Sequence, residues 1–199
     1  EFPEDGYQGE DIKDLAKEYA DLNGDSLVNV SAEERKKALV DYALPKNIKK
    51  MQADMEKYKI FYDKWFFESE LHKSGAVKAV VDLLTKKGLT YEKDGAVWYK
   101  NKEVLTQKLL KEGKSQKYID NLELKDDVLI RQNGNPTYFT ADIAYHKNKF
   151  DRGFTTLIDV WGADHHGHVM RMKGAMDAIG YDGDKLNVVL MQLVKLVKD

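Results

Sequence analysis

The sequence predicts an α/β fold, in which a parallel sheet packs against helices, preceded by a mixed α+β region. Thr155–Trp161 is a short, apolar, β-branched run that stops at Gly162, as is typical of a buried parallel strand. His165–Ile179 follows as a helix that Gly180 closes. Asn187–Met191 is a second apolar run, and a single helix between two strands favours a parallel pair.

Composition sets wide limits on function. The 199 residues are 42% hydrophobic and 33% charged, with a net charge of −2, so nothing draws the whole chain toward nucleic acid. The absence of cysteine excludes disulfides and thiolate chemistry. No stretch is long and apolar enough to span a bilayer and no signal peptide is recognisable, so we expect a cytoplasmic protein. The chain starts at Glu1 without a methionine, and the apolar stretch Leu186–Val197 needs a packing partner, so we expect a piece of a longer protein.

The first third of the chain is predicted to be helical. Asp11–Leu22 has a helical pattern. Ser31 and Glu34 form a capping box that opens a second helix over residues 32–59, with a break expected at Pro45. Its charges are mixed in sign, which is typical of a solvated helix face.

An aromatic cluster follows this helical region. We expect its side chains to lie in the core rather than to form a base-stacking surface. Its members are Phe61, Tyr62, Trp65, Phe66 and Phe67. Ser74–Lys87 then has the pattern of an amphipathic helix that ends at Gly88.

The middle of the chain predicts a small antiparallel sheet. Leu89–Glu92 and Ala96–Lys100 flank Asp94-Gly95, a dipeptide that favours a tight hairpin turn. Asn101–Asp127 is polar and rich in lysine, and we expect a surface insertion there. Val128–Gln132 is the next strand candidate.

A helix is expected directly after Pro136. Tyr138, Asp142, Tyr145 and His146 fall on one face of it at helical spacing.

The polar residues Lys147–Gly153 would end this helix before the first parallel strand begins. The sequence GADHHGH (162–168) then follows that strand. Ligands of open α/β sheets bind beyond the carboxyl ends of the strands, so we expect the site there. Together with His146, this segment holds four of the five histidines.

Three interpretations of these residues stay open on chemistry alone. Asp142 beside Tyr138 suits a guanidinium or ammonium group, because a carboxylate accepts a bidentate fork, and Asp164 could accept from ribose hydroxyls. The histidines could instead simply cap and line a helix start. A metal site, as in metal-dependent phosphoesterases, would use ligands from the set Asp164, His165, His166 and His168.

Four stretches resemble the bacterial-type arginyl-tRNA synthetases, in the same order and across nearly the whole chain. They are FPEDGYQGEDI (2–12), EKDGAVWYK (92–100), YFTADIAYH (138–146) and WGADHHGH (161–168). The resemblance implies part of a class I Rossmann-like catalytic domain with an inserted α+β connective module. Residues 1–30 would end the first Rossmann half, 31–132 would form the connective insertion, and 133–199 the second half. Asn101–Asp127 departs from the shorter linker usual in the family.

Class I synthetases carry HIGH-like and KMSKS-like signatures, and we expect neither in these 199 residues. His165-His166-Gly167-His168 fits the pattern H-x-G-H literally. In the family, however, the HIGH element precedes the FPEDGYQG stretch, and the KMSKS element follows LMQLVKLVKD (190–199).

The resemblance implies roles for six residues in arginine–tRNA ligation. Tyr138, Asp142 and His165 match the side that binds substrate arginine. Gly162, Asp164 and His168 match the side that binds ATP. No catalytic residue and no protein-held metal are expected within the chain.

The implied partners are L-arginine, tRNA(Arg), and ATP as a co-substrate with Mg²⁺, with no membrane involved. The full-length enzyme would be a monomer, and these 199 residues would be inactive alone. Two alternatives stay open: the metal-dependent phosphoesterase using Asp164, His165 and His166, and a non-catalytic module that binds substrate or RNA.

Overall fold

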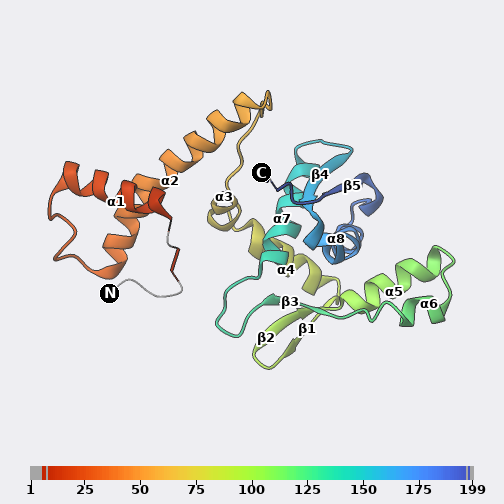
Figure 1. The fold of residues 1–199 in the computed structure, drawn as a ribbon. Helices are drawn as coiled ribbons and strands as arrows, with labels where there is room; N and C mark the ends of the chain where they lie inside the picture. Colours follow the sequence, from red (N-terminus) through yellow and green to blue (C-terminus); the bar gives the residue numbers. More distant parts are fainter. Residues whose placement is uncertain (1–5, 8, 196, 198–199) are drawn as a thin grey trace. The chain divides into compact units, whose positions relative to one another are not determined.

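A computed structural model describes residues 6–7, 9–195 and 197, which form two compact units, Glu1–Trp65 and Phe66–Asp199 (Figure 1). Residues 2–5 and 8 of the N-terminal segment of the resemblance, 2–12, lie outside the described residues. The predicted division into 1–30, 31–132 and 133–199 concerns the plan of the family's longer enzymes and stays a prediction.

The first unit is a pair of helices, α1 (Glu10–Asn23) and α2 (Ala32–Lys57). The predicted capping box is present: the Ser31 hydroxyl accepts from the Glu34 amide at 3.2 Å, and the Glu34 carboxylate accepts from the Ser31 amide at 3.0 Å. The predicted break at Pro45 is wrong, because α2 runs through it without interruption. A proline removes a single main-chain donor, and the hydrogen bonds on either side carry the helix past it.

The aromatic cluster does not form a core, so that prediction is wrong for most of its members. Phe61, Tyr62 and Phe67 are exposed, and Trp65 is only half-buried. Phe66 alone joins the second unit's core, where its ring stacks on Tyr145 with 4.8 Å between centroids. Residues 60–67 precede α3 (Glu68–Lys73) without a helix or strand of their own. The Tyr62 and Trp65 rings contact each other edge to face, with 5.2 Å between centroids, but outside the core.

The second unit begins with two helices, α3 (Glu68–Lys73) and α4 (Ala76–Lys86). A three-stranded antiparallel sheet follows, in the order β1 (Thr90–Lys93), β2 (Ala96–Tyr99) and β3 (Asp127–Ile130). The predicted hairpin is confirmed.

The hairpin turn has the geometry that its sequence favours. Asp94 and Gly95 have φ values of 53° and 73°. Two successive positive φ values match the right-handed twist of the flanking strands, and glycine adopts them at little cost.

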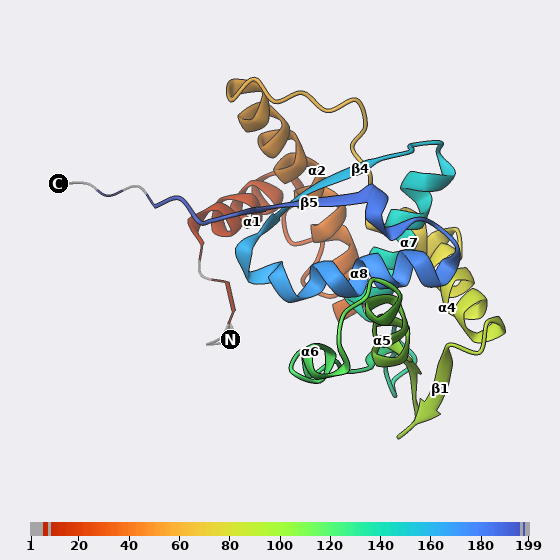
Figure 2. The same cartoon turned by 90° about the vertical axis from the view of Figure 1, so that its right-hand side faces the viewer.

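The region 101–127 is more than a surface insertion, and that expectation is wrong for its first half. It forms α5 (Asn101–Lys111) and α6 (Gln116–Asp120), and α5 buries Leu105 and Leu109, one helical turn apart. A Cβ atom added at Gly174 of α8 (His166–Ile179) would lie 2.7 Å from Leu105 Cδ2. Glycine therefore lets α5 pack closely on α8 (Figure 2).

The remaining elements form the predicted parallel unit. They are α7 (Tyr138–Asp151), β4 (Leu157–Gly162), the 3-10 turn η1 (Ala163–His165), α8 (His166–Ile179), a second 3-10 turn η2 (Gly183–Lys185) and β5 (Leu186–Met191). Strands β4 and β5 pair in parallel, from Leu157 opposite Leu186 to Gly162 opposite Met191, which confirms the prediction. The predicted helix end at Lys147 is wrong, because α7 continues to Asp151.

The core of the second unit lies where α7 and α8 meet α4 and the β4–β5 pair (Figure 1). One face of the parallel pair contributes Leu157 and Leu186 to this core. Its other face is exposed, and Leu193 and Val194 after β5 are exposed too, so the packing partner expected for Leu186–Val197 is found among the described residues only for the inner face of β5. None of the helices in the described part of the chain is long and apolar enough to cross a membrane.

Candidate functional site

The site is built on the N-terminal half of α7, which is fixed to strand β3. Thr137 caps the helix and donates its hydroxyl to the Val128 carbonyl at 2.8 Å. One turn later, the buried Thr140 hydroxyl donates to the Leu129 carbonyl, also at 2.8 Å. These bonds set the position of the helix start, from which Tyr138 points into solvent and Asp142 follows one turn on.

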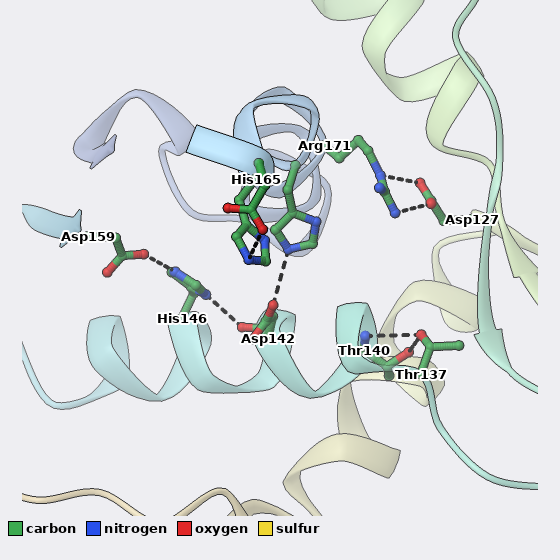
Figure 3. Close-up of polar contacts among 10 residues, drawn as sticks. Asp127, Thr137, Thr140, Asp142, His146, Asp159, His165 and Arg171 are labelled. Carbon is green, nitrogen blue, oxygen red and sulfur yellow. Dashed lines mark hydrogen bonds and ion pairs between the residues drawn. The ribbon is translucent and has the colours of Figure 1, made fainter. Parts of the chain in front are cut away.

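The Asp142 carboxylate lies at the centre of the site (Figure 3). Its Oδ2 atom is 3.1 Å from Nε2 of His168 on α8. The Asp142 side chain is 42% exposed, whereas that of His168 is 16% exposed. The carboxylate is thus hydrogen-bonded to the protein through His168, and the rest of it is open to solvent.

A buried polar network supports the same helix from the strand side. His146 Nδ1 lies 2.7 Å from the Asp142 carbonyl, and Nε2 lies 2.5 Å from the carboxylate of Asp159 on β4. Lys149 Nζ is 2.6 Å from the other Asp159 oxygen. Both neighbours of the His146 ring, a backbone carbonyl and a carboxylate, are hydrogen-bond acceptors.

Burial alone would raise the pKa of the Asp159 carboxyl. The hydrogen bonds and charges of His146 and Lys149 outweigh this effect and lower that pKa below its usual value. Asp159 is therefore ionised at neutral pH and clamps α7 to β4.

The turn after β4 presents the other polar groups. Asp164 is 82% exposed and lies 3.7 Å from His165. A Cβ atom added at Gly162 would approach Asp164 Oδ1 to 2.4 Å, so a larger residue there would displace the Asp164 side chain. The His165 ring neighbours those of Trp161 and His168, with centroids 6.2 and 6.4 Å away.

An ion pair closes the far side of the site. Arg171 of α8 bonds to both carboxylate oxygens of Asp127, and its guanidinium lies 4.8 Å from the centre of the Phe139 ring. Burial raises the pKa of the Asp127 carboxyl, and the Arg171 charge only partly offsets this. The pair ties α8 to β3 beside His168.

Sequence comparison connects this geometry to known proteins. No family model matches the sequence. Arginine–tRNA ligases of Caldanaerobacter subterraneus and Ruminiclostridium cellulolyticum are 54% and 50% identical to it over the whole chain. The whole chain is homologous to a segment of the arginyl-tRNA synthetases. It spans about a third of the length of the curated synthetases it matches, 32% in both cases.

Solved structures agree with this relationship to arginyl-tRNA synthetases. A Campylobacter jejuni structure described as an arginyl-tRNA synthetase is 36% identical, with a TM-score of 0.79 over all of this chain and 39% of its own. The arginyl-tRNA synthetase of Thermus thermophilus has a TM-score of 0.61 at 18% identity, covering 90% of this chain and 34% of its own, and it supports the fold alone. The predicted class I synthetase α/β fold is thereby confirmed.

The synthetase-like site brings together part of the predicted set. Asp142, His165 and His168 meet in one cluster, and Gly162 and Asp164 form the turn beside it (Figure 3). Tyr138 is exposed one turn before Asp142. His166 points elsewhere and lines a separate cavity of about 590 Å³ with Asn101, Leu122, Met170 and Arg171.

Sequence reasoning missed Asp159 and Lys149. Asp159 lies in a strand that is otherwise apolar, and Lys149 lies in Lys147–Gly153, which we interpreted as a polar break. Neither pattern marks its residue as part of a site. The usable signal was the single charge inside TTLIDVW, because a carboxylate in a buried strand requires a cationic partner.

The phosphoesterase alternative finds no support in this geometry. Within residues 6–7, 9–195 and 197, no three His, Asp or Glu side chains are grouped so that they could hold a metal ion. Asp164 and His165 lie together, but His166 faces the other cavity.

Proposed function

We propose that this chain is the arginine-binding segment of an enzyme that activates L-arginine with ATP and transfers it to tRNA(Arg). The observation that carries the proposal is the Asp142 carboxylate, fixed by His168 yet open to solvent, next to the turn that ends a parallel strand. Its homology to arginine–tRNA ligases along the whole chain supports the same activity.

Asp142 would bind the guanidinium of arginine. A guanidinium offers parallel N–H donors that match the two oxygens of a carboxylate, and such charge-assisted bonds are about twice as strong as neutral ones. Tyr138, at the start of α7, would contact the arginine side chain, and His165, in the turn after β4, would lie beside it.

The nucleotide would lie beside the Gly162 turn. Gly162 leaves room for close approach, and the exposed Asp164 carboxylate could accept from ribose hydroxyls. Mg²⁺ would arrive bound to the ATP phosphates and neutralise their charge; the described residues offer no metal-binding cluster of their own. His168 was assigned to ATP by resemblance, and its observed partner is Asp142 instead.

The reaction proposed for the complete enzyme has two steps. The carboxylate oxygen of arginine attacks the α-phosphorus of ATP, and pyrophosphate leaves. The 2′-hydroxyl of the terminal adenosine of tRNA then attacks the arginyl carbonyl, and AMP leaves. Neither step needs a protein nucleophile, so this chain would contribute position and charge. Such an enzyme is expected to act as a cytoplasmic monomer.

The test is Asp142→Asn in an arginyl-tRNA synthetase that contains these 199 residues. This substitution keeps the shape and removes the charge that faces the guanidinium. A charge-assisted bond contributes roughly 1.5–3 kcal/mol, so kcat/KM for arginine should fall about ten- to a hundredfold. The KM for ATP should change less than about twofold.

Asp82→Asn is the matched control, since Asp82 is an exposed carboxylate on α4. It should leave the kinetics for both substrates unchanged. An arginine dependence that survives Asp142→Asn would remove Asp142 from the site.

A further inference from the structure

His168 is the one group of the α8 start that bonds directly to the Asp142 side chain among the described contacts. Its Nε2 atom points at Asp142 Oδ2 at 3.1 Å. Its ring lies between Phe139 and Trp161, with centroid distances of 5.5 and 5.3 Å. The two aromatic rings therefore restrict the orientation of the His168 ring, and its hydrogen bond restricts the orientation of the Asp142 carboxylate.

The difference in exposure separates the roles of the two side chains. Solvent reaches 42% of the Asp142 side chain but only 16% of the His168 side chain. A ligand can approach the carboxylate, while the imidazole is mostly covered and its Nε2 is already engaged by Asp142.

We propose that His168 is a positioning residue for arginine, which orients the Asp142 carboxylate and does not contact the nucleotide. This inference rests on the proposed function. It changes the role that the family resemblance implied for His168.

The physical reason lies in the lone pairs of the carboxylate. Each oxygen can accept two hydrogen bonds, and His168 takes one position on Oδ2. Rotation of the carboxylate is then restricted, and the remaining positions face the open side. A guanidinium that binds there meets two carboxylate oxygens already aligned with its N–H donors. The Asp142 side chain therefore loses less conformational entropy on binding than an unrestrained carboxylate would.

Two substitutions separate the donor from the ring. His168→Phe keeps a ring between Phe139 and Trp161 but removes the N–H. His168→Gln keeps a donor near the position of Nε2 while removing the ring. Asp142 is half exposed, so water can hydrate it in either variant and the fold should persist. His72→Phe is the matched control, because His72 is a partly exposed histidine on α3 that bonds to Glu68.

The measurement is arginine-dependent pyrophosphate exchange, with tRNA present, in the synthetase that contains this segment. His168→Phe should raise the KM for arginine about tenfold and the KM for ATP less than twofold. His168→Gln should restore the arginine KM to within about threefold of the unsubstituted enzyme. His72→Phe should change neither constant.

The outcomes distinguish this inference from the proposed function. If the unsubstituted enzyme shows no arginine-dependent exchange, the proposed function fails and the inference fails with it. If exchange occurs and His168→Phe leaves the arginine KM unchanged, or raises the ATP KM instead, only the inference is overturned. If both constants rise in His168→Phe, recovery of the arginine KM in His168→Gln upholds the inference, and its absence overturns it.

Discussion

Replacing Asp159 by asparagine should unfold the second unit at much lower denaturant concentration. Asp159 accepts from His146 Nε2 and from Lys149 Nζ, and its side chain is 6% exposed. Asparagine keeps one acceptor oxygen but places an amide N–H₂ where the second donor points. Lys149 or the His146 ring then loses its acceptor and faces another donor.

The size of the effect follows from this geometry. Each charge-assisted bond contributes roughly 1.5–3 kcal/mol. Breaking a buried pair by removing one partner costs about 3–5 kcal/mol, because the other charge remains buried. We therefore expect a loss of about 3 kcal/mol in the free energy of unfolding, which corresponds to a drop in Tm of roughly 10 °C.

Equilibrium unfolding of the 199-residue chain measures this loss directly. Trp161 lies 6.1 Å from the His146 ring, so tryptophan fluorescence reports on this part of the molecule. The matched control is Asp82→Asn, which removes a single pairing with Lys78 where both side chains are largely exposed. An exposed pair contributes about 0–1 kcal/mol, so this control should lose at most that amount.

The dependence on pH gives a second check of the same reasoning. The pKa of Asp159 is lowered in the folded protein, so its contribution is present above the unfolded value of about 4. It is lost as the pH falls through the folded pKa. The stability difference between the original chain and Asp159→Asn should therefore be largest near neutral pH and shrink below about pH 4. A difference under 1 kcal/mol at pH 7, or one that stays constant on acidification, would refute the buried network.

Two further outcomes are expected. Gly162→Ala should raise the KM for ATP in the complete synthetase while leaving stability nearly unchanged, because the new Cβ displaces only the exposed Asp164 side chain; an unchanged KM would separate this turn from the nucleotide. The 199-residue chain assayed alone with ATP, labelled arginine and tRNA should not aminoacylate, since the sequence contains no KMSKS element and we expect its H-x-G-H to differ from the family's HIGH. Robust turnover would show that His165–His168 is that signature after all.

Local patterns predicted the regular elements of this chain well. The capping box at Ser31, the hairpin turn at Asp94-Gly95 and the parallel pairing of β4 with β5 each follow from a few neighbouring residues. In these cases a hydrogen bond, a permitted φ value or the handedness of a short connection leaves few alternatives. Asp142 was also singled out from the sequence as a carboxylate beside Tyr138 on a helix face, and the structure places it against His168.

Contacts between distant elements were not predictable in the same way. The polar region 101–127 was expected on the surface, yet Leu105 packs against Gly174 some seventy positions later. The aromatic rings Phe61 and Tyr62 were expected in the core, and they are exposed because no neighbouring element covers them. The composition of a segment indicates which of its side chains could be buried. Whether they are buried depends on which other elements pack against them.

Helix α7 has attachments that would let the proposed site serve two ligands. Its N-terminal end is fixed to β3 through Thr137 and Thr140, and its middle is clamped to β4 through His146 and Asp159. Strand β4 continues directly into the Gly162 turn. Asp142 lies on the helix between these two attachments, so its distance from the turn is set by buried hydrogen bonds rather than by a loop. Reaction between arginine and the α-phosphate requires the two substrates to be held in a fixed relative position. The charge buried at Asp159 therefore costs desolvation but fixes the spacing between the arginine side and the nucleotide side of the proposed site.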